Sequence, residues 1–155
     1  MTVSKTELYD QLGSQLSSLL NGERDLIANA ANFSSLIFHS LPDLNWAGFY
    51  FVKEEELVLG PFQGNPACVR MPIGQGVCGA AASRRETVIV PNVHEFPGHI
   101  ACDSASNSEI VVPLMKGERL IGVLDLDSPV SSRFDRDDAA GLERLISILM
   151  SSVSS

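Results

Sequence analysis

The chain has 155 residues and a net charge of -8, from 19 acidic and 11 basic side chains, and this length suits one domain that buries roughly 68–70% of its unfolded surface. Because no basic run is longer than the pair Arg84-Arg85, the composition lacks a phosphate-backbone footprint and excludes nucleic acid and anionic membrane as partners. No apolar stretch reaches bilayer length and the polar start is unlike a signal peptide, so we expect a cytoplasmic protein with a single domain over residues 1–155.

Two amphipathic helices are predicted at the start of the chain, one on each side of the break at Asn21-Gly22. Leucines recur at helical spacing before this break, and apolar residues recur in the same way over residues 26–37. The aromatic and β-branched run at 46–52 then predicts a strand. Three shorter strands are predicted in the β-rich runs that follow, at 56–59, 67–71 and 87–90.

A long irregular segment at residues 91–107 comes after a short predicted helix at 77–83. Loops of this length in a small domain are mostly lids, binding loops or disordered segments. This segment contains Phe96, Ile100 and two histidines, which argue against plain disorder. It is therefore interpreted as a lid or a binding loop.

Two β-rich runs near the end of the chain, at 109–115 and 119–127, are joined by the connection Lys116-Gly117-Glu118, which suits a hairpin. The last helix is predicted to begin near Asp135, where Asp138 completes a pattern that resembles a capping box. The sequence has no internal repeat and no linker. Together these elements predict an α+β fold, in which the N- and C-terminal helices pack on one face of a largely antiparallel sheet and leave the other face for a ligand.

Three cysteines, Cys68, Cys78 and Cys102, form an odd set that a reducing compartment would keep as thiols. A bridge among them would be a transient step in a reaction. Cys102 lies in the polar loop three residues after His99, which favours a reactive thiolate, although an ordinary loop cysteine is an equal alternative. Cys78 would gain thiolate character at the start of the short helix, but a small core residue is favoured there. Cys68 lies in a predicted strand, where a core position is favoured.

Two further motifs carry little weight. Residues 74–79 match G-x-G-x-x-G, but no βαβ unit encloses them, so a dinucleotide site is not predicted. The three cysteines, His94 and His99 lack the paired spacing of a zinc site. We therefore expect no metal.

Acidic side chains gather on the predicted hairpin. Asp125 and Asp127 are two residues apart on one strand, so they share a face about 6–7 Å apart, together with Ile121. Glu109 reaches this face from the neighbouring strand. Like charges held together raise at least one pKa and keep a proton available. The pattern suits a site for a cationic group, and solvation of an exposed strand end is an equal alternative.

Aromatic side chains face the same region of the predicted sheet. Trp46 and Tyr50 share one face of the first strand. They could form the wall of such a site with an apolar surface and a hydroxyl group. Core packing alone also accounts for them.

Four ordered blocks of sequence are more specific: CVRMPIGQGVCG at 68–79, VHEFPGHIACD at 93–103, SEIVVP at 108–113 and GVLDLDS at 122–128. Together they resemble the free methionine-(R)-sulfoxide reductases, which are stand-alone GAF domains. The resemblance implies a six-stranded antiparallel sheet with helices behind it, and a closed pocket capped by the loop of Cys102.

The resemblance also implies a role for each candidate residue. Cys102 would be the attacking thiolate, Cys68 the main resolving thiol and Cys78 a secondary resolving or auxiliary thiol. Three carboxyl groups would bind the substrate ammonium and hold a proton on the sulfoxide oxygen, and two aromatic rings would surround the methylthio end. The carboxyl groups are those of Glu109, Asp125 and Asp127, and the rings are those of Trp46 and Tyr50.

The implied reaction is the reduction of free L-methionine-(R)-sulfoxide to L-methionine through a cysteine sulfenic acid and an intramolecular disulfide. Thioredoxin would recycle the enzyme, and neither a metal nor an organic cofactor would be needed because the cysteines carry both electrons. The resemblance favours a homodimer. The alternative is a non-enzymatic GAF domain that senses a small molecule or a redox state.

Overall fold

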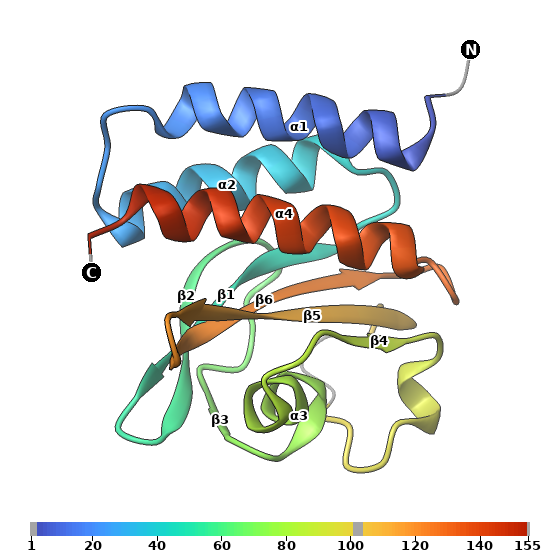
Figure 1. Cartoon of the computed structure of the whole chain (residues 1–155). Helices are drawn as coiled ribbons and strands as arrows, with labels where there is room; N and C mark the ends of the chain where they lie inside the picture. The colour runs from blue at the N-terminus through green and yellow to red at the C-terminus, as the bar shows by residue number, and fades with distance from the viewer. Residues whose placement is uncertain (1–2, 101–103, 155) are drawn as a thin grey trace.

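Six strands form one antiparallel sheet in the order β3-β2-β1-β6-β5-β4 (Figure 1). The computed structural model describes residues 3–100 and 104–154. Within these ranges the elements are α1 (Lys5–Leu20), α2 (Leu26–Ser40), β1 (Trp46–Lys53), β2 (Glu56–Gly64), β3 (Arg70–Pro72), α3 (Gly76–Arg84), β4 (Val88–Val90), the 3-10 turn η1 (Val93–Glu95), β5 (Ser108–Lys116), β6 (Arg119–Ser128) and α4 (Arg136–Ser152).

Helices α1, α2 and α4 lie on one side of the sheet, and α3 lies on the other (Figure 1). The larger core fills the space between the sheet and the first group of helices, where α2 contacts β1 and β2 and α4 contacts β5. The predicted α+β arrangement, with terminal helices on one face, is confirmed. Because α3 covers only part of the opposite face, that face keeps room for a site.

Helix α1 packs on α4 and α2 of its own chain. Its leucines Leu12, Leu16 and Leu20 are buried in the larger core, and full burial of such a side chain stabilises the fold by about 1.5–3 kcal/mol. Close approach of α1 to α4 depends on Gly141, because a Cβ atom at that position would overlap the Tyr9 ring. The apolar stripe of the first helix is therefore covered within the chain.

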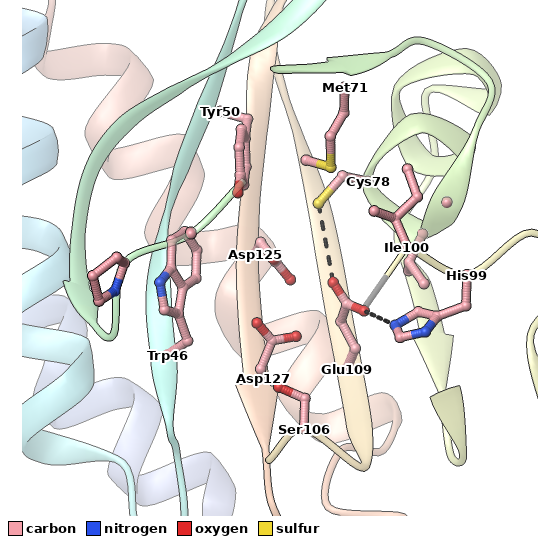
Figure 2. A pocket seen from close by; sticks show the side chains of 14 residues that line it. Trp46, Tyr50, Met71, Cys78, His99, Ile100, Ser106, Glu109, Asp125 and Asp127 are labelled. Carbon is pink, nitrogen blue, oxygen red and sulfur yellow. Dashed lines mark hydrogen bonds and ion pairs between the residues drawn. The ribbon is translucent and has the colours of Figure 1, made fainter. Parts of the chain in front are cut away.

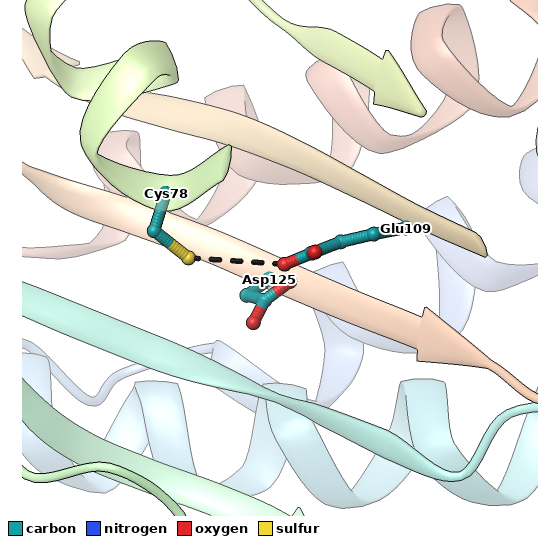
Figure 3. A group of neighbouring side chains, drawn as sticks. All are labelled: Cys78, Glu109 and Asp125. Atoms are coloured by element: carbon teal, nitrogen blue, oxygen red, sulfur yellow. Dashed lines mark hydrogen bonds between the residues drawn. The ribbon is translucent and has the colours of Figure 1, made fainter. Parts of the chain in front are cut away.

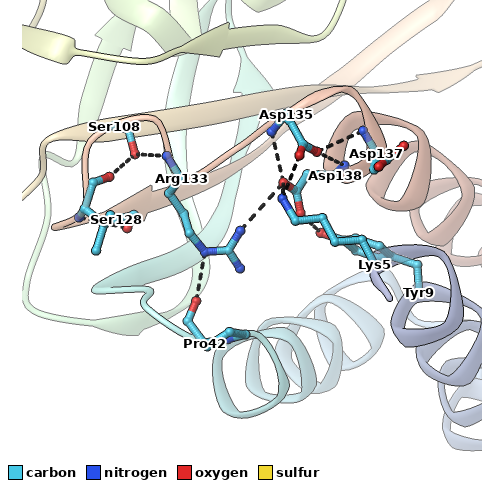
Figure 4. A network of polar contacts seen from close by, with 10 residues as sticks. Lys5, Tyr9, Pro42, Ser108, Ser128, Arg133, Asp135, Asp137 and Asp138 are labelled. Carbon is cyan, nitrogen blue, oxygen red and sulfur yellow. Dashed lines mark hydrogen bonds and ion pairs between the residues drawn. The ribbon is translucent and has the colours of Figure 1, made fainter. Parts of the chain in front are cut away.

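A buried carboxylate joins these two helices (Figure 4). Asp138 accepts hydrogen bonds from Lys5 Nζ at 2.6 Å and from the Tyr9 hydroxyl at 2.7 Å. It also accepts the backbone N–H of Asp135, whose side chain caps the first turn of α4 in return. The predicted capping box is therefore present, and its second member also fixes the position of α1.

Replacement of Asp138 by alanine should destabilise the protein by about 2–4 kcal/mol, because it removes half of the capping box and leaves the buried Tyr9 hydroxyl without an acceptor. Thermal or urea unfolding measures this loss. Arg144→Ala is the matched control, because it breaks only the exposed Arg144–Asp10 pair between the same helices; exposed pairs contribute at most about 1 kcal/mol. Equal losses in the two variants would contradict the role given to Asp138.

Three details differ from the sequence-based expectations. Strand β3 begins only at Arg70, so the predicted strand position of Cys68 is wrong: Cys68 is half-buried in the loop that joins β2 to β3. Strand β2 runs on to Gly64 because it pairs with β1 along that whole length. In β6 the pairing with β5 shifts at Ile121, which packs on the helix side of the sheet and not on the face of Asp125 as predicted.

None of the helices in the described part of the chain has both the length and the apolar character required to cross a bilayer. The longest, α4, has 17 residues. It also carries charged residues in its first turn, among them Asp137.

Candidate active site

A small cavity, of about 40 Å³, lies on the face of the sheet opposite α1, α2 and α4 (Figure 2). Strands β1, β5 and β6 form its floor, while α3, the β2–β3 loop and the segment before Ile100 surround it. The lining residues are Trp46, Tyr50, Pro66, Ala67, Met71, Gly76, Val77, Cys78, His99, Ile100, Ser106, Glu109, Asp125 and Asp127. All five of the carboxyl and aromatic residues selected from the sequence are among them.

The pairing of the strands brings the carboxyl groups together. Glu109 on β5 lies directly opposite Asp127 on β6. Asp125 lies two residues before Asp127 on the same strand. On the other edge of β6, Trp46 pairs with Asp127 and Gly48 with Asp125. Residues opposite one another in antiparallel strands share a face, so the acids and the indole face one cavity.

The irregularity at Ile121 sets this alignment. Next to the turn Lys116 pairs with Arg119, whereas beyond the irregularity Leu114 pairs with Gly122. The extra residue in β6 shifts the register by one, and a shift by one exchanges the faces of all the following side chains. Without it, Glu109 would lie opposite Leu126 on the helix side.

Burial changes the ionisation of these acids. Glu109 and Asp125 are each only 6% exposed. Desolvation raises the pKa of Glu109 well above its ordinary value, and the charges of Asp125 and Asp127 raise it further. Desolvation also raises the pKa of Asp125, while hydrogen bonds with Glu109 and Cys78 work against that rise. Burial therefore favours the protonated form of Glu109, and from that form the carboxyl can donate its proton to a bound ligand.

The substitution Glu109→Gln should stabilise the ligand-free protein at neutral pH. Because the folded-state pKa of Glu109 is raised, its contribution to stability is fully present below its unfolded pKa, about 4.3, and is lost as pH rises toward the folded-state value. Glutamine has no such loss. For each pH unit by which the folded-state pKa of Glu109 exceeds its unfolded-state pKa, the variant should gain about 1.4 kcal/mol in free energy of unfolding relative to wild type. Unfolding curves at pH 4 to 8 would measure this gain.

The matched control for this prediction is Glu86→Gln, on the exposed loop before β4, which should leave the pH dependence of unfolding unchanged. A gain in stability that is equal at low and high pH in Glu109→Gln would contradict the raised pKa.

The aromatic wall is a stack of three rings. Trp46 stacks on Tyr50 with ring centroids 5.9 Å apart and on Phe62 with centroids 5.2 Å apart. The indole N–H donates to the Asn65 carbonyl, and the Tyr50 hydroxyl donates to the Cys68 carbonyl at 2.9 Å. Tyr50 lines the cavity, and its hydroxyl also holds the loop that carries Cys68.

The three cysteines differ in their surroundings. Cys68 takes part in a disulfide, whereas Cys78 is a free, buried thiol. The favoured interpretation of Cys78 as a small buried residue is confirmed. The alternative, a thiolate favoured by the helix start, is wrong, because desolvation and the charges of Asp125 and Glu109 raise the pKa of Cys78 well above its ordinary value. Cys102, the predicted nucleophile, lies outside the described residues.

Some lining residues were not selected from the sequence, among them Met71, Ile100 and Ser106. Ile100 lies against α3, where a Cβ on Gly76 would come within 3.2 Å of its side chain; glycine at 76, with φ of 69°, lets the segment approach so closely. His99 lines the cavity too, with Nε2 4.0 Å from Glu109 Oε1. The sequence signal for Ile100 and His99 is the apolar and histidine content of the long loop, whereas Met71 and Ser106 have no such signal.

The arrangement suits a small ligand with a positive charge and an oxygen to protonate. Asp125 Oδ1 is buried and has no hydrogen-bond partner among the described residues, so it can accept a bond from a ligand. The sulfur of Cys78 and the carboxyl oxygens of Glu109 and Asp125 lie within 4.8 Å of one another and are the described residues that could hold a metal ion (Figure 3).

Comparison with known proteins identifies the fold and the relatives. The GAF domain family matches residues 6–153. The free methionine-R-sulfoxide reductase of Escherichia coli is 50% identical over 147 residues, which cover 95% of this chain and 89% of that protein.

Two solved structures are also close. A candidate GAF sensor protein from Burkholderia vietnamiensis has a TM-score of 0.94 and 59% identity, covering 97% of this chain and 96% of that one. The free methionine-R-sulfoxide reductase from Neisseria meningitidis, solved with its substrate, has a TM-score of 0.94 and 44% identity, covering 98% of this chain and 92% of that one. The chain belongs to the GAF domain family and, within it, to the free methionine-R-sulfoxide reductases.

Proposed function

We propose that this protein reduces free L-methionine-(R)-sulfoxide to L-methionine with electrons from its own cysteines. The observation that carries the proposal is a set of three carboxyl groups beside an aromatic wall, in which Glu109 and Asp125 are buried and burial raises the pKa of Glu109. The names of the relatives from E. coli and N. meningitidis support the same substrate.

Binding would use the charge of the site. The α-ammonium of the substrate would pair with the carboxylates of Asp125 and Asp127, and the open acceptor of Asp125 supports this placement. Trp46 would pack against the methylthio end. A peptide-bound sulfoxide lacks the free ammonium and would leave the buried carboxylates unpaired, which explains selection of the free amino acid.

The chemistry would begin at Cys102. Its thiolate attacks the sulfoxide sulfur while the Glu109 carboxyl protonates the leaving oxygen. Methionine leaves, and the oxygen remains on Cys102 as a sulfenic acid. A second thiol then attacks this sulfur, forming a disulfide and releasing water. Exchange with the dithiol of thioredoxin returns both cysteines to thiols.

Cys68 would be the thiol that resolves the sulfenic acid. Its disulfide-bonded state supports this role, and the raised pKa of the buried Cys78 disfavours attack by that residue. The Tyr50 bond to the Cys68 carbonyl would hold the loop in place for the reaction.

The substitution Cys68→Ser should therefore spare the first turnover and impair the later ones. A rapid single-turnover assay should release about one methionine per protein, whereas steady-state cycling with thioredoxin should fall by at least about tenfold because the sulfenic acid has no internal partner. Cys78→Ser is the comparison variant and should lose less cycling. Equal loss of both phases in Cys68→Ser would contradict a resolving role.

The deciding experiment is NADPH consumption with thioredoxin and thioredoxin reductase. Three substrates are offered separately: the free (R)-sulfoxide, the free (S) epimer and a peptide-bound sulfoxide. Turnover with the free (R) epimer alone is expected. No turnover with any of them, in folded and reduced protein, would refute the proposal.

A sensor without turnover is the second candidate, favoured by the likeness to the Burkholderia vietnamiensis protein. It predicts that a ligand raises the melting temperature without being converted. Conversion of the sulfoxide by wild-type protein would exclude it as the sole function.

A further inference from the structure

The floor of the cavity gathers the donor types that soft divalent cations prefer. Cys78 Sγ lies 4.0 Å from Glu109 Oε2, and one oxygen of Asp125 completes a group within 4.8 Å (Figure 3). Thiolate and carboxylate oxygens together are zinc ligands. We propose that Cys78, Glu109 and Asp125 form a site for a zinc-type divalent cation that competes with the substrate; the competition rests on the proposed function.

A second observation points independently to a ligand at this place. Asp125 is 6% exposed, lines the cavity, and its Oδ1 atom has no hydrogen-bond partner in the described part of the chain. A buried carboxylate oxygen without a partner carries a desolvation cost that a bound cation would remove.

The charge of the surroundings favours a dication. Glu109, Asp125 and Asp127 line the cavity, and the nearest basic group among the described lining residues is the His99 imidazole, with Nε2 4.0 Å from Glu109. The substrate ammonium would supply one positive charge, and a dication would supply two at the same carboxylates. Both ligands therefore cannot occupy the floor at once.

The donor atoms of the three residues need to move only slightly closer together to bind a zinc ion. Zinc bonds of about 2.0–2.3 Å to oxygen, nitrogen and sulfur place ligand atoms about 3.3–3.8 Å apart in a tetrahedron. The described donors lie at 4.0 Å and below 4.8 Å. His99 is close enough to become the fourth ligand after a side-chain movement, and water is the alternative. Binding would break the Cys78 S–H bond and the O–H bond of the protonated Glu109 carboxyl, and would release both protons to the buffer. Metal–sulfur and metal–oxygen bonds would form without oxidation.

This site differs from the zinc arrangement considered from the sequence. That arrangement used scattered cysteines and histidines, including His94, whose exposed side chain does not line the cavity. The present cluster is buried in the floor of the cavity. A cation bound there would inhibit turnover, and a chelator that removes the cation would restore it.

The test uses Co²⁺ as the probe, because a cobalt–thiolate bond has a charge-transfer absorption in the near ultraviolet. Non-reduced wild-type protein, in which Cys68 stays in its disulfide, is titrated and should develop this band with one equivalent. Cys78→Ser should not develop it. Asp125→Asn should keep the band but bind more weakly, by at least about the 10–100-fold that loss of an outer-shell partner costs. His94→Ala is the matched control and should behave as wild type.

Excess free methionine sulfoxide should displace the cobalt and abolish the band. A missing band in folded wild-type protein, or a band that survives in Cys78→Ser, would overturn the site. If Cys78→Ser does not fold, wild-type cobalt affinity in Asp125→Asn would overturn it. A band that persists at saturating substrate would overturn the competition. Turnover measured separately in chelator tests the proposed function, so the two failures are distinguishable.

Discussion

Replacement of Cys102 by serine is expected to abolish reduction of the free sulfoxide, with a loss in kcat of at least about a thousandfold. A hydroxyl is a far weaker nucleophile than a thiolate near neutral pH, and its attack would leave no sulfenic acid to be reduced. Cys78 should not replace Cys102 as the nucleophile, because Cys78 is buried and its pKa is raised.

Two measurements separate loss of chemistry from loss of binding. Single-turnover release of methionine should disappear in Cys102→Ser, while free methionine should still raise its melting temperature because the carboxyl groups remain. The exposed Ser104, two residues away, provides the control: Ser104→Ala should keep its rate. More than about a tenth of wild-type turnover in Cys102→Ser would overturn the nucleophile assignment.

The fold was predictable because its signals are local. Helical spacing of leucines, the capping pattern at Asp135 and the turn at Lys116-Gly117-Glu118 each depend on neighbours in the sequence, and each is present in the structure. The shared face of Trp46 and Tyr50 follows in the same way from the period of a strand.

The remaining details depend on tertiary contacts. A register shift at Ile121 leaves no mark in an apolar run, yet it places Glu109 opposite Asp127. Cys68 lies in a loop because β3 pairs with β2 only from Arg70 onward. Met71 lines the cavity only because α3 packs against the sheet, and the sequence does not show this contact. The ionisation of Cys78 could not be predicted from the sequence either, because its raised pKa comes from burial beside acidic residues that are distant in the sequence.

The substitutions Glu109→Gln and Asp127→Asn are expected to weaken binding and rate together. In Asp127→Asn the loss of a charged partner for the substrate ammonium costs about 1.5–3 kcal/mol, or roughly 10–100-fold in KM. In Glu109→Gln the loss of the donated proton should lower kcat by a further factor of about 10²–10⁴.

The pH profile and the stability together distinguish catalysis from simple damage. Wild-type kcat/KM should fall at high pH as Glu109 loses its proton at its raised pKa, and this limb should vanish in Glu109→Gln. The same variant should be more stable than wild type at neutral pH, so slow turnover could not be attributed to misfolding. Unchanged kinetics in both variants, or a high-pH limb that persists in Glu109→Gln, would remove the carboxyl groups from the mechanism; the exposed Glu86→Gln should match wild type in every assay.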